Sequence, residues 1–133
     1  MPVPYQIDHD ERLVVASPQG VLTDEDVFGY QQEVWSRPDV RGYDELIDMT
    51  SVTEIEFIST KRVAFLADLS ASMDPPALTS KLAIVATADL HFGLARVYET
   101  YRETAKQGTK SVRVFRNRNE ALHWLGASVE AAS

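Results

Sequence analysis

Leu82-Ala83-Ile84-Val85-Ala86 is the most apolar of the strand-like segments in this sequence. A short apolar run without polar alternation predicts a β-strand that is buried on both faces. Glu45-Leu46-Ile47-Asp48-Met49 predicts a second such strand, because Leu46 and Ile47 follow each other directly. Strands of this kind are typical of a parallel sheet with helices packed against both faces. The two segments therefore predict the centre of an α/β fold.

Three further strands are predicted around this centre. Tyr5-Gln6-Ile7-Asp8 and Leu13-Val14-Val15-Ala16 flank a short polar turn, which predicts a β-hairpin. Val112-Arg113-Val114-Phe115 predicts the last strand. With one helix in each later connection and one at the end, the order is ββαβαβαβα. This order predicts a mostly parallel mixed sheet of about five strands with an N-terminal hairpin, covered by about four helices.

The helices are predicted from their capping residues and stop signals. Thr23, with Asp26 three residues later, predicts a capped helix start, and Pro38 predicts the end of that helix. The other three helices are predicted to start between Glu56 and Ser59, at Asp89 as a capping residue, and at Asn117. Gly126 predicts the end of the last helix.

The composition is that of one globular domain. The chain has 133 residues, of which 44% are hydrophobic and none is cysteine, so disulfides and thiolate sites are excluded. We expect a single domain over residues 1–126 and a frayed tail over residues 127–133. No apolar run is long enough to span a bilayer, and residues 1–5 lack the pattern of a secretion signal. We therefore expect a cytoplasmic protein with no stable membrane insertion.

The charge is unevenly distributed along the chain. The net charge is −7; residues 1–60 carry 13 acidic and 3 basic side chains, whereas residues 61–133 carry 7 acidic and 10 basic ones. Nucleic-acid-binding domains normally have a basic face and a basic pI, so no nucleic-acid partner is expected. The asymmetry could orient a charged partner or a second copy in a homodimer. The alternative is two faces that are solvated differently.

Three segments carry a resemblance to a known family. Residues 46–56, LIDMTSVTEIE, combine an apolar pair, an Asp and a short turn before a helix. Residues 114–125, VFRNRNEALHWL, run from a Val-Phe strand end into a helix with an Ala-Leu pair, and residues 20–23, GVLT, fit a turn into the first helix. Over nearly its whole length the chain resembles the STAS domain of bacterial anti-sigma-factor antagonists, the SpoIIAA-like group. The resemblance implies a non-enzymatic regulatory module that binds a protein, such as an anti-sigma factor, a kinase-like protein or a second copy.

One departure from that family bears on mechanism. In its switch-type members, the loop before the second helix carries Asp-Ser-Ser/Thr-Gly, and a partner kinase phosphorylates one hydroxyl. This chain has Glu56-Phe57-Ile58-Ser59 there, so Ser59 or Thr60 is a phosphoacceptor only if the alignment shifts. We therefore expect no phosphoswitch. In this respect the chain is more similar to the SpoIIAA-like branch related to the CRAL-TRIO fold, which implies binding of a lipid or small apolar ligand as the alternative function.

The predicted partner-binding loop lies at the carboxyl edge of the sheet, where open α/β sheets bind their ligands. It comprises Asp48, Thr50, Ser51, Glu56, Phe57, Ile58 and Ser59. The helix start after it favours an acidic group or phosphate of a partner. Other polar residues expected at this edge are Thr87, Asp89, His91, Arg116 and Arg118. The alternative is that these residues form turns and caps or are simply solvated.

A pocket between helices and sheet is the second predicted site. Its expected lining is Phe57, Phe65, Phe92 and Tyr98, each of which is alternatively a core residue. Tyr98, Tyr101 and Arg102 also share one predicted helix, and these residue types are enriched in binding hot spots. One hypothesis is therefore an exposed face used for self-association or ligand enclosure. The alternative is a core stripe beneath a solvated face.

No catalytic, metal or cofactor site is predicted. Asp48, Ser59 and His91 could supply an acid, a nucleophile and a base, but no motif brings them together. The histidines lack metal-ligand spacing, and the glycines form no phosphate-binding loop. Binding is therefore the predicted class of function, and an enzyme with an unrecognised site is the third alternative.

Overall fold

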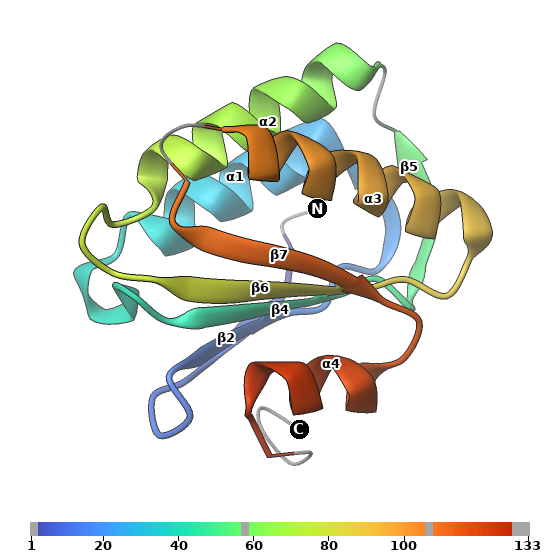
Figure 1. Ribbon diagram of the computed structural model, residues 1–133. Helices are drawn as coiled ribbons and strands as arrows, with labels where there is room; N and C mark the ends of the chain where they lie inside the picture. Colours follow the sequence, from blue (N-terminus) through green and yellow to red (C-terminus); the bar gives the residue numbers. More distant parts are fainter. Residues whose placement is uncertain (1–2, 57–58, 106–107, 129–133) are drawn as a thin grey trace.

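The computed structural model describes residues 3–56, 59–105 and 108–128, and its main feature is a five-stranded sheet in the order β1-β2-β4-β6-β7 (Figure 1). β1 is antiparallel to β2, and the other neighbouring strands are parallel. The strands are β1 Tyr5–Asp8, β2 Leu13–Ala16, β4 Asp44–Asp48, β6 Ser80–Val85 and β7 Lys110–Phe115. The predicted α/β class, the hairpin and the parallel centre are confirmed.

Helices cover both faces of this sheet unequally. In Figure 1, α1, α2 and α3 lie on one face, and α4 lies alone on the other. The described residues form α1 Asp24–Trp35, α2 Thr60–Met73, α3 Asp89–Thr104 and α4 Arg118–Leu125, with a short 3-10 helix at Pro38–Val40. The face under three helices carries the larger of the two buried clusters.

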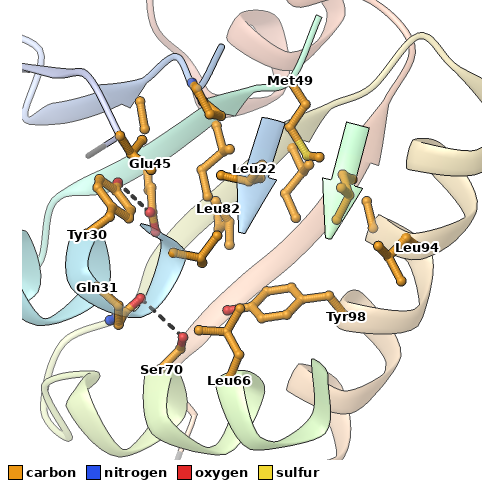
Figure 2. A pocket seen from close by; sticks show the side chains of 18 of the residues that line it. Leu22, Tyr30, Gln31, Glu45, Met49, Leu66, Ser70, Leu82, Leu94 and Tyr98 are labelled. Atoms are coloured by element: carbon orange, nitrogen blue, oxygen red, sulfur yellow. Dashed lines mark hydrogen bonds between the residues drawn. The ribbon is translucent and has the colours of Figure 1, made fainter. Parts of the chain in front are cut away.

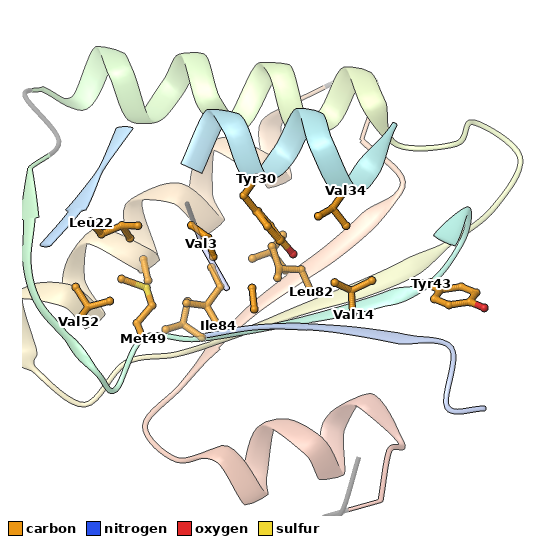
Figure 3. Close-up of a cluster of buried hydrophobic side chains, with 14 of the residues drawn as sticks. Val3, Val14, Leu22, Tyr30, Val34, Tyr43, Met49, Val52, Leu82 and Ile84 are labelled. Atoms are coloured by element: carbon orange, nitrogen blue, oxygen red, sulfur yellow. The ribbon is translucent and has the colours of Figure 1, made fainter. Parts of the chain in front are cut away.

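Side-chain alternation along the strands builds two separate cores. Val14 and Ala16 of β2 belong to the core beneath α1, α2 and α3, which Figure 3 shows. Leu13 and Val15 of the same strand point to the opposite face and pack with Leu122 of α4. Burial of one such aliphatic side chain stabilises the fold by roughly 1.5–3 kcal/mol. The apolar strands predicted from the sequence therefore supply both cores.

Two predicted helix starts are confirmed by their caps. The Thr23 hydroxyl accepts a hydrogen bond from the Asp26 backbone N–H at 3.1 Å, and the Thr23 N–H donates to the Asp26 carboxylate at 3.2 Å. The Asn117 side chain accepts from the Glu120 backbone N–H at 2.8 Å. Gly126 ends α4 with a φ of 73°, a left-handed conformation that favours glycine.

The other two helix starts differ from the prediction. α2 begins at Thr60, and Ser59 caps it by accepting from the Arg62 N–H at 3.4 Å. α3 begins at Asp89, so the cap position belongs to Ala88, which makes no side-chain cap. The prediction that Asp89 caps α3 is wrong, because its carboxylate pairs with Arg116 at 2.8 Å instead.

Two short strands were not predicted. β3, Gly20–Thr23, and β5, Val52–Glu56, pair in parallel as a separate two-stranded sheet. Gly20–Thr23 was interpreted as a turn into the first helix, and Glu56 was placed near the start of the second. Strands this short show little alternation, because only Leu22 and Val52 are buried among their residues. Their pairing is set by tertiary contacts rather than by local pattern.

The chain after α4 remains attached to the domain for two residues. The Ala127 N–H donates to the Leu122 carbonyl at 3.0 Å, and the Ser128 N–H donates to the Glu11 carboxylate at 3.4 Å. The rest of the predicted tail, residues 129–133, lies outside the described residues. Within the described ranges, no helix is both long and apolar enough to cross a membrane.

Candidate functional site

The carboxyl edge of the sheet is organised by internal pairing. The Asp48 carboxylate accepts from the Thr50 backbone N–H at 3.0 Å and from Arg118 at 2.9 Å. Arg116 similarly binds Asp89 at 2.8 Å and the Thr87 carbonyl at 3.0 Å. The contact between Asp48 and Thr50 matches the alternative in which these residues form turns. The ion pairs of Asp48 with Arg118 and of Asp89 with Arg116 were not predicted. The edge therefore presents few unpaired charges to a ligand.

The remaining residues of the predicted partner loop lie on the surface. Thr50, Ser51 and Glu56 are exposed, and so are the two predicted phosphoacceptors, Ser59 and Thr60. Phe57 and Ile58 fall outside the described residues. Exposure makes the loop accessible to a protein, but partner binding and phosphorylation at this loop stay predictions.

Of the predicted aromatic lining, Phe65 and Phe92 are wrong and Tyr98 is confirmed, while Phe57 lies outside the described residues. Phe65 is 56% exposed on the outer side of α2, and Phe92 packs at the margin of the core. Neither residue lines the interior cavity, and neither does Tyr101, whereas Tyr98 does. The helical spacing of these residues was clear, but spacing alone does not tell which side of a helix faces the sheet.

The predicted exposed face of Tyr98 and Arg102 is also wrong. Arg102 is 4% exposed, and its guanidinium binds the Asp74 carboxylate through two hydrogen bonds of 2.9 and 3.2 Å. Burial alone lowers the pKa of Arg102, but Tyr98 and the bonds to Asp74 raise it above its usual value. The residue is therefore a charged structural anchor beneath α3 rather than part of an interface.

An apolar cavity lies between the sheet and helices α1, α2 and α3 (Figure 2). The space open to the centre of a water-sized sphere is about 90 Å³. Ile47 of β4 and Tyr98 of α3 line this cavity, and both residues are partly buried rather than fully buried. The rest of the lining is Val3, Ala16, Pro18, Leu22, Val27, Tyr30, Gln31, Glu45, Met49, Ile55, Val63, Leu66, Ser70, Leu82, Ile84, Leu94 and Ala95.

One end of the cavity is closed by a polar cluster around Glu45, which is 3% exposed. Its carboxylate accepts from the Tyr30 hydroxyl at 2.6 Å and from the Trp35 indole N–H at 3.2 Å. The Lys110 ammonium completes the set at 3.2 Å from the other oxygen. Burial raises the pKa of Tyr30 well above its usual value, and the neighbouring Glu45 charge raises it further.

A second polar contact lies beside this cluster. The Ser70 hydroxyl donates to the Gln31 side-chain carbonyl at 3.1 Å, as Figure 2 shows. Burial also raises the pKa of Tyr98, so this phenol stays neutral at physiological pH. The cavity thus has an apolar body and a polar end whose groups are already bonded to one another.

The acid, nucleophile and base considered from the sequence are not joined in the described part of the chain. Asp48 and Ser59 are engaged in the contacts described above, and no hydrogen bond in the described part of the chain joins them to each other or to His91. The residues that the structure describes contain no cluster of metal-ligating side chains. Sequence reasoning anticipated a pocket in this place but missed Glu45, Lys110 and Gln31, which carried no motif.

Comparison with known proteins identifies a similar fold but no related sequence family. Neither a protein-family model nor a curated protein sequence matches the chain. A crystal structure of an uncharacterized DUF3478-family protein from Shewanella loihica PV-4, which is described as having a SpoIIAA-like fold, matches with a TM-score of 0.57. The match covers 92% of this chain and 91% of that chain at 18% identity. A shared fold at this identity does not transfer function. The chain therefore has a SpoIIAA-like α/β fold, as the sequence resemblance implied.

Proposed function

We propose that the protein binds a small, uncharged, apolar molecule in the cavity beneath α1, α2 and α3. The observation that carries this proposal is the apolar lining of an interior space of about 90 Å³. Protein interiors are normally close-packed, and cavities cost roughly 24 cal/mol per Å³. Left empty, this one costs on the order of 2 kcal/mol by that measure. An apolar occupant would recover that free energy.

The polar end of the cavity argues for an uncharged ligand. Glu45 already accepts three hydrogen bonds and faces the Lys110 ammonium, and Ser70 is bonded to Gln31. A charged ligand group would leave water and find no free partner there, which costs several kcal/mol. Affinity must therefore come from burial of apolar surface.

The size of the cavity limits what it can hold. An engineered apolar cavity of about 150 Å³ in another protein binds benzene or xenon. A space of about 90 Å³ fits a short aliphatic segment or a small ring after slight side-chain adjustment. The ligand is thus either a very small molecule or the end of a longer apolar chain.

Filling the cavity with Ala95→Leu is expected to abolish ligand binding without destabilising the protein. Ala95 lies on α3, is buried and lines the cavity, so a larger side chain can occupy the empty space. The measurement is thermal unfolding with benzene as the probe. Wild type should unfold at a higher temperature as benzene is added, because a ligand at 100 times its Kd stabilises by about 2.7 kcal/mol. The variant should show no such rise.

The matched control is Ala67→Leu. Ala67 is fully buried on α2 but does not line the cavity. The same enlargement there should overpack the core and cost about 1–3 kcal/mol. Equal destabilisation by both substitutions, or no response of wild type to benzene or xenon, would show that the cavity is not a binding site.

Protein binding is the second candidate function, and it is favoured by a cluster on α1 and α2 in which Phe65 is exposed and Phe28 and Arg62 are partly buried. Phe65 meets Phe28 edge to face with ring centroids 5.5 Å apart. The guanidinium carbon of Arg62 lies 4.8 Å from the Phe28 centroid and 5.6 Å from that of Phe65. Asp24 holds Arg62 in place through a 2.8 Å ion pair. Aromatic and Arg side chains held in this way are typical of interface hot spots. Phe28, Arg62 and Phe65 are named the aromatic–arginine patch.

Its proposed occupant is a basic protein segment that carries an apolar side chain. Arg62 is already neutralised by Asp24, so neighbouring residues set the local charge. Glu25 lies one turn before Phe28 on α1, and both residues belong to that helix. Asp68 lies one turn after Phe65 on α2. Glu25 and Asp68 are both exposed. Together they outweigh Lys61, and the whole chain carries a net charge of −7. A regulatory partner with Lys or Arg around an apolar anchor complements this surface.

Selection of a random peptide library on the immobilised protein tests this function. The selected peptides should combine basic residues with one large apolar residue, and Phe65→Ser should weaken their binding about 30-fold, the effect of losing a 2 kcal/mol hot spot. Leu90→Ser is the control, because Leu90 is 79% exposed and belongs to α3. Peptides without charge preference, or equal binding to Phe65→Ser, would count against it. A dimer that Phe65→Ser dissociates would identify the occupant as a second copy instead.

A further inference from the structure

A second pocket lies at the amino ends of the parallel strands, beside the first residues of β6 and β7. The space open to the centre of a water-sized sphere is about 180 Å³, larger than the apolar cavity. Trp35, Tyr43 and Met73 contribute apolar surface, while Arg41 and Ser80 contribute polar groups. We propose that this pocket binds a small organic anion with a flat apolar body, such as an aromatic carboxylate.

Ser80 supplies a hydroxyl that is open to the pocket. The residue is 8% exposed and lines the pocket. Its backbone N–H donates to the Thr109 carbonyl, but its hydroxyl makes no hydrogen bond to any residue that the structure describes. Because the hydroxyl is not among the fully buried polar atoms, it is accessible from the pocket. A ligand oxygen placed in the pocket can therefore form a hydrogen bond with it.

Arg41 gives the pocket an excess positive charge. Every other charged lining residue has a counter-ion; the pairs are Lys110 with Glu45, Arg37 with Asp39, and Asp74 with Arg102. Arg41, by contrast, forms no ion pair with a described residue. Its guanidinium has all its N–H donors available, and two parallel N–H groups match the geometry of a carboxylate. The charge balance of the pocket therefore favours a monoanion.

The helix ends beside the pocket oppose this charge only weakly. α1 and α2 both end there, and the carboxyl end of a helix carries a partial negative charge. At the end of α1, the Ser36 hydroxyl donates to the Gln32 carbonyl at 2.6 Å, and the Arg37 N–H donates to the Val34 carbonyl at 3.1 Å. Carbonyls that are already bonded in this way attract cations less, so they offset less of the positive charge of Arg41, which is exposed at the pocket.

The walls explain why the anion should carry a flat apolar body. The Trp35 ring is held in place by its hydrogen bond to Glu45 and by the Lys110 ammonium 3.4 Å above its centroid. The Tyr43 hydroxyl bonds His9 at 2.7 Å. Rigid aromatic walls lose little entropy when a ring packs against them. An aromatic ring of benzene size fits a space larger than the roughly 150 Å³ that holds benzene elsewhere.

Titration with benzoate, followed by calorimetry and amide NMR shifts, tests the proposal. Benzoate should bind and shift amides of residues around Trp35, Arg41 and Ser80, while neutral benzamide and cationic benzylammonium should bind at least about tenfold more weakly. Arg41→Gln and Ser80→Ala should each weaken benzoate binding by about tenfold, the value of one hydrogen bond to a charged group. Ser80→Ala should leave the unfolding midpoint unchanged, because the wild-type hydroxyl has no partner to lose.

Two control variants make the outcome decisive. Arg113→Gln removes the same charge from an exposed arginine on β7 and should leave benzoate binding unchanged. Ala95→Leu fills the other cavity and should also have no effect. The proposal is overturned if benzoate fails to bind at millimolar concentration, if benzamide binds equally well, or if Arg113→Gln weakens binding as much as Arg41→Gln.

Discussion

Lys110→Met is expected to lower the free energy of unfolding by about 3–5 kcal/mol, the usual effect of removing one partner from a buried ion pair. The side chains of Lys110 and Glu45 are 5% and 4% exposed, and they lie 3.2 Å apart. Without the ammonium, the largely buried Glu45 carboxylate keeps only the Tyr30 and Trp35 side chains as protein donors. Urea unfolding at neutral pH measures the loss.

The double variant Glu45→Gln/Lys110→Met separates charge from packing. It removes both charges, so it should recover a large part of the loss, since replacing a whole buried pair is often close to neutral. Arg96→Met serves as the surface comparison. Arg96 pairs with Glu99 at 3.0 Å but is 62% exposed, so its loss should stay below about 1 kcal/mol. If Lys110→Met lowered the free energy of unfolding by no more than Arg96→Met does, the buried pair would not be stabilising.

Arg102→Met is expected to cost a similar 3–5 kcal/mol for the same reason. Asp74 ends α2 and accepts from Arg102 and from the backbone N–H groups of Thr109 and Lys110, at 3.0 and 3.1 Å. One carboxylate thereby ties the end of α2 to α3 and to the start of β7. Its side chain is 5% exposed, so the loss of the guanidinium leaves a buried charge with backbone donors only.

Arg102→Lys tests whether geometry matters in addition to charge. Lysine keeps the positive charge but cannot form the two parallel hydrogen bonds of a guanidinium. The free energy of unfolding of Arg102→Lys, measured with urea, should therefore lie between that of wild type and that of Arg102→Met. If Arg102→Lys were as damaging as Arg102→Met, the two-pronged contact would matter more than the charge; if Arg102→Met were harmless, the anchor assigned to Arg102 would be wrong.

The sequence predicted the main sheet because its signals were local. The apolar runs of β2 and β6 and the caps at Thr23 and Asn117 each act within a few residues, and all four were confirmed. β3 and β5 escaped prediction because each is stabilised by the other, across about thirty residues of chain. Pairing at that distance leaves no signal in a short window.

The candidate sites were harder to predict than the fold. The presence of a pocket between helices and sheet followed from the architecture, but of its expected aromatic residues Tyr98 alone was found to line it among those described. Glu45 and Lys110 looked like ordinary charged residues at strand ends, since nothing local shows that two such residues will be buried together. Arg102 was likewise predicted on an exposed interface or pocket face, because nothing in the local sequence shows that it pairs with Asp74.

The small β3–β5 sheet has a consequence for how this protein could diversify. Leu22 and Ile55 line the cavity but belong to strands that pair only with each other within the described chain. Replacing them reshapes the cavity while leaving the register of β2, β4, β6 and β7 intact. Substitutions in the small sheet can thus change the shape of the cavity while the main sheet keeps the pairing on which folding depends.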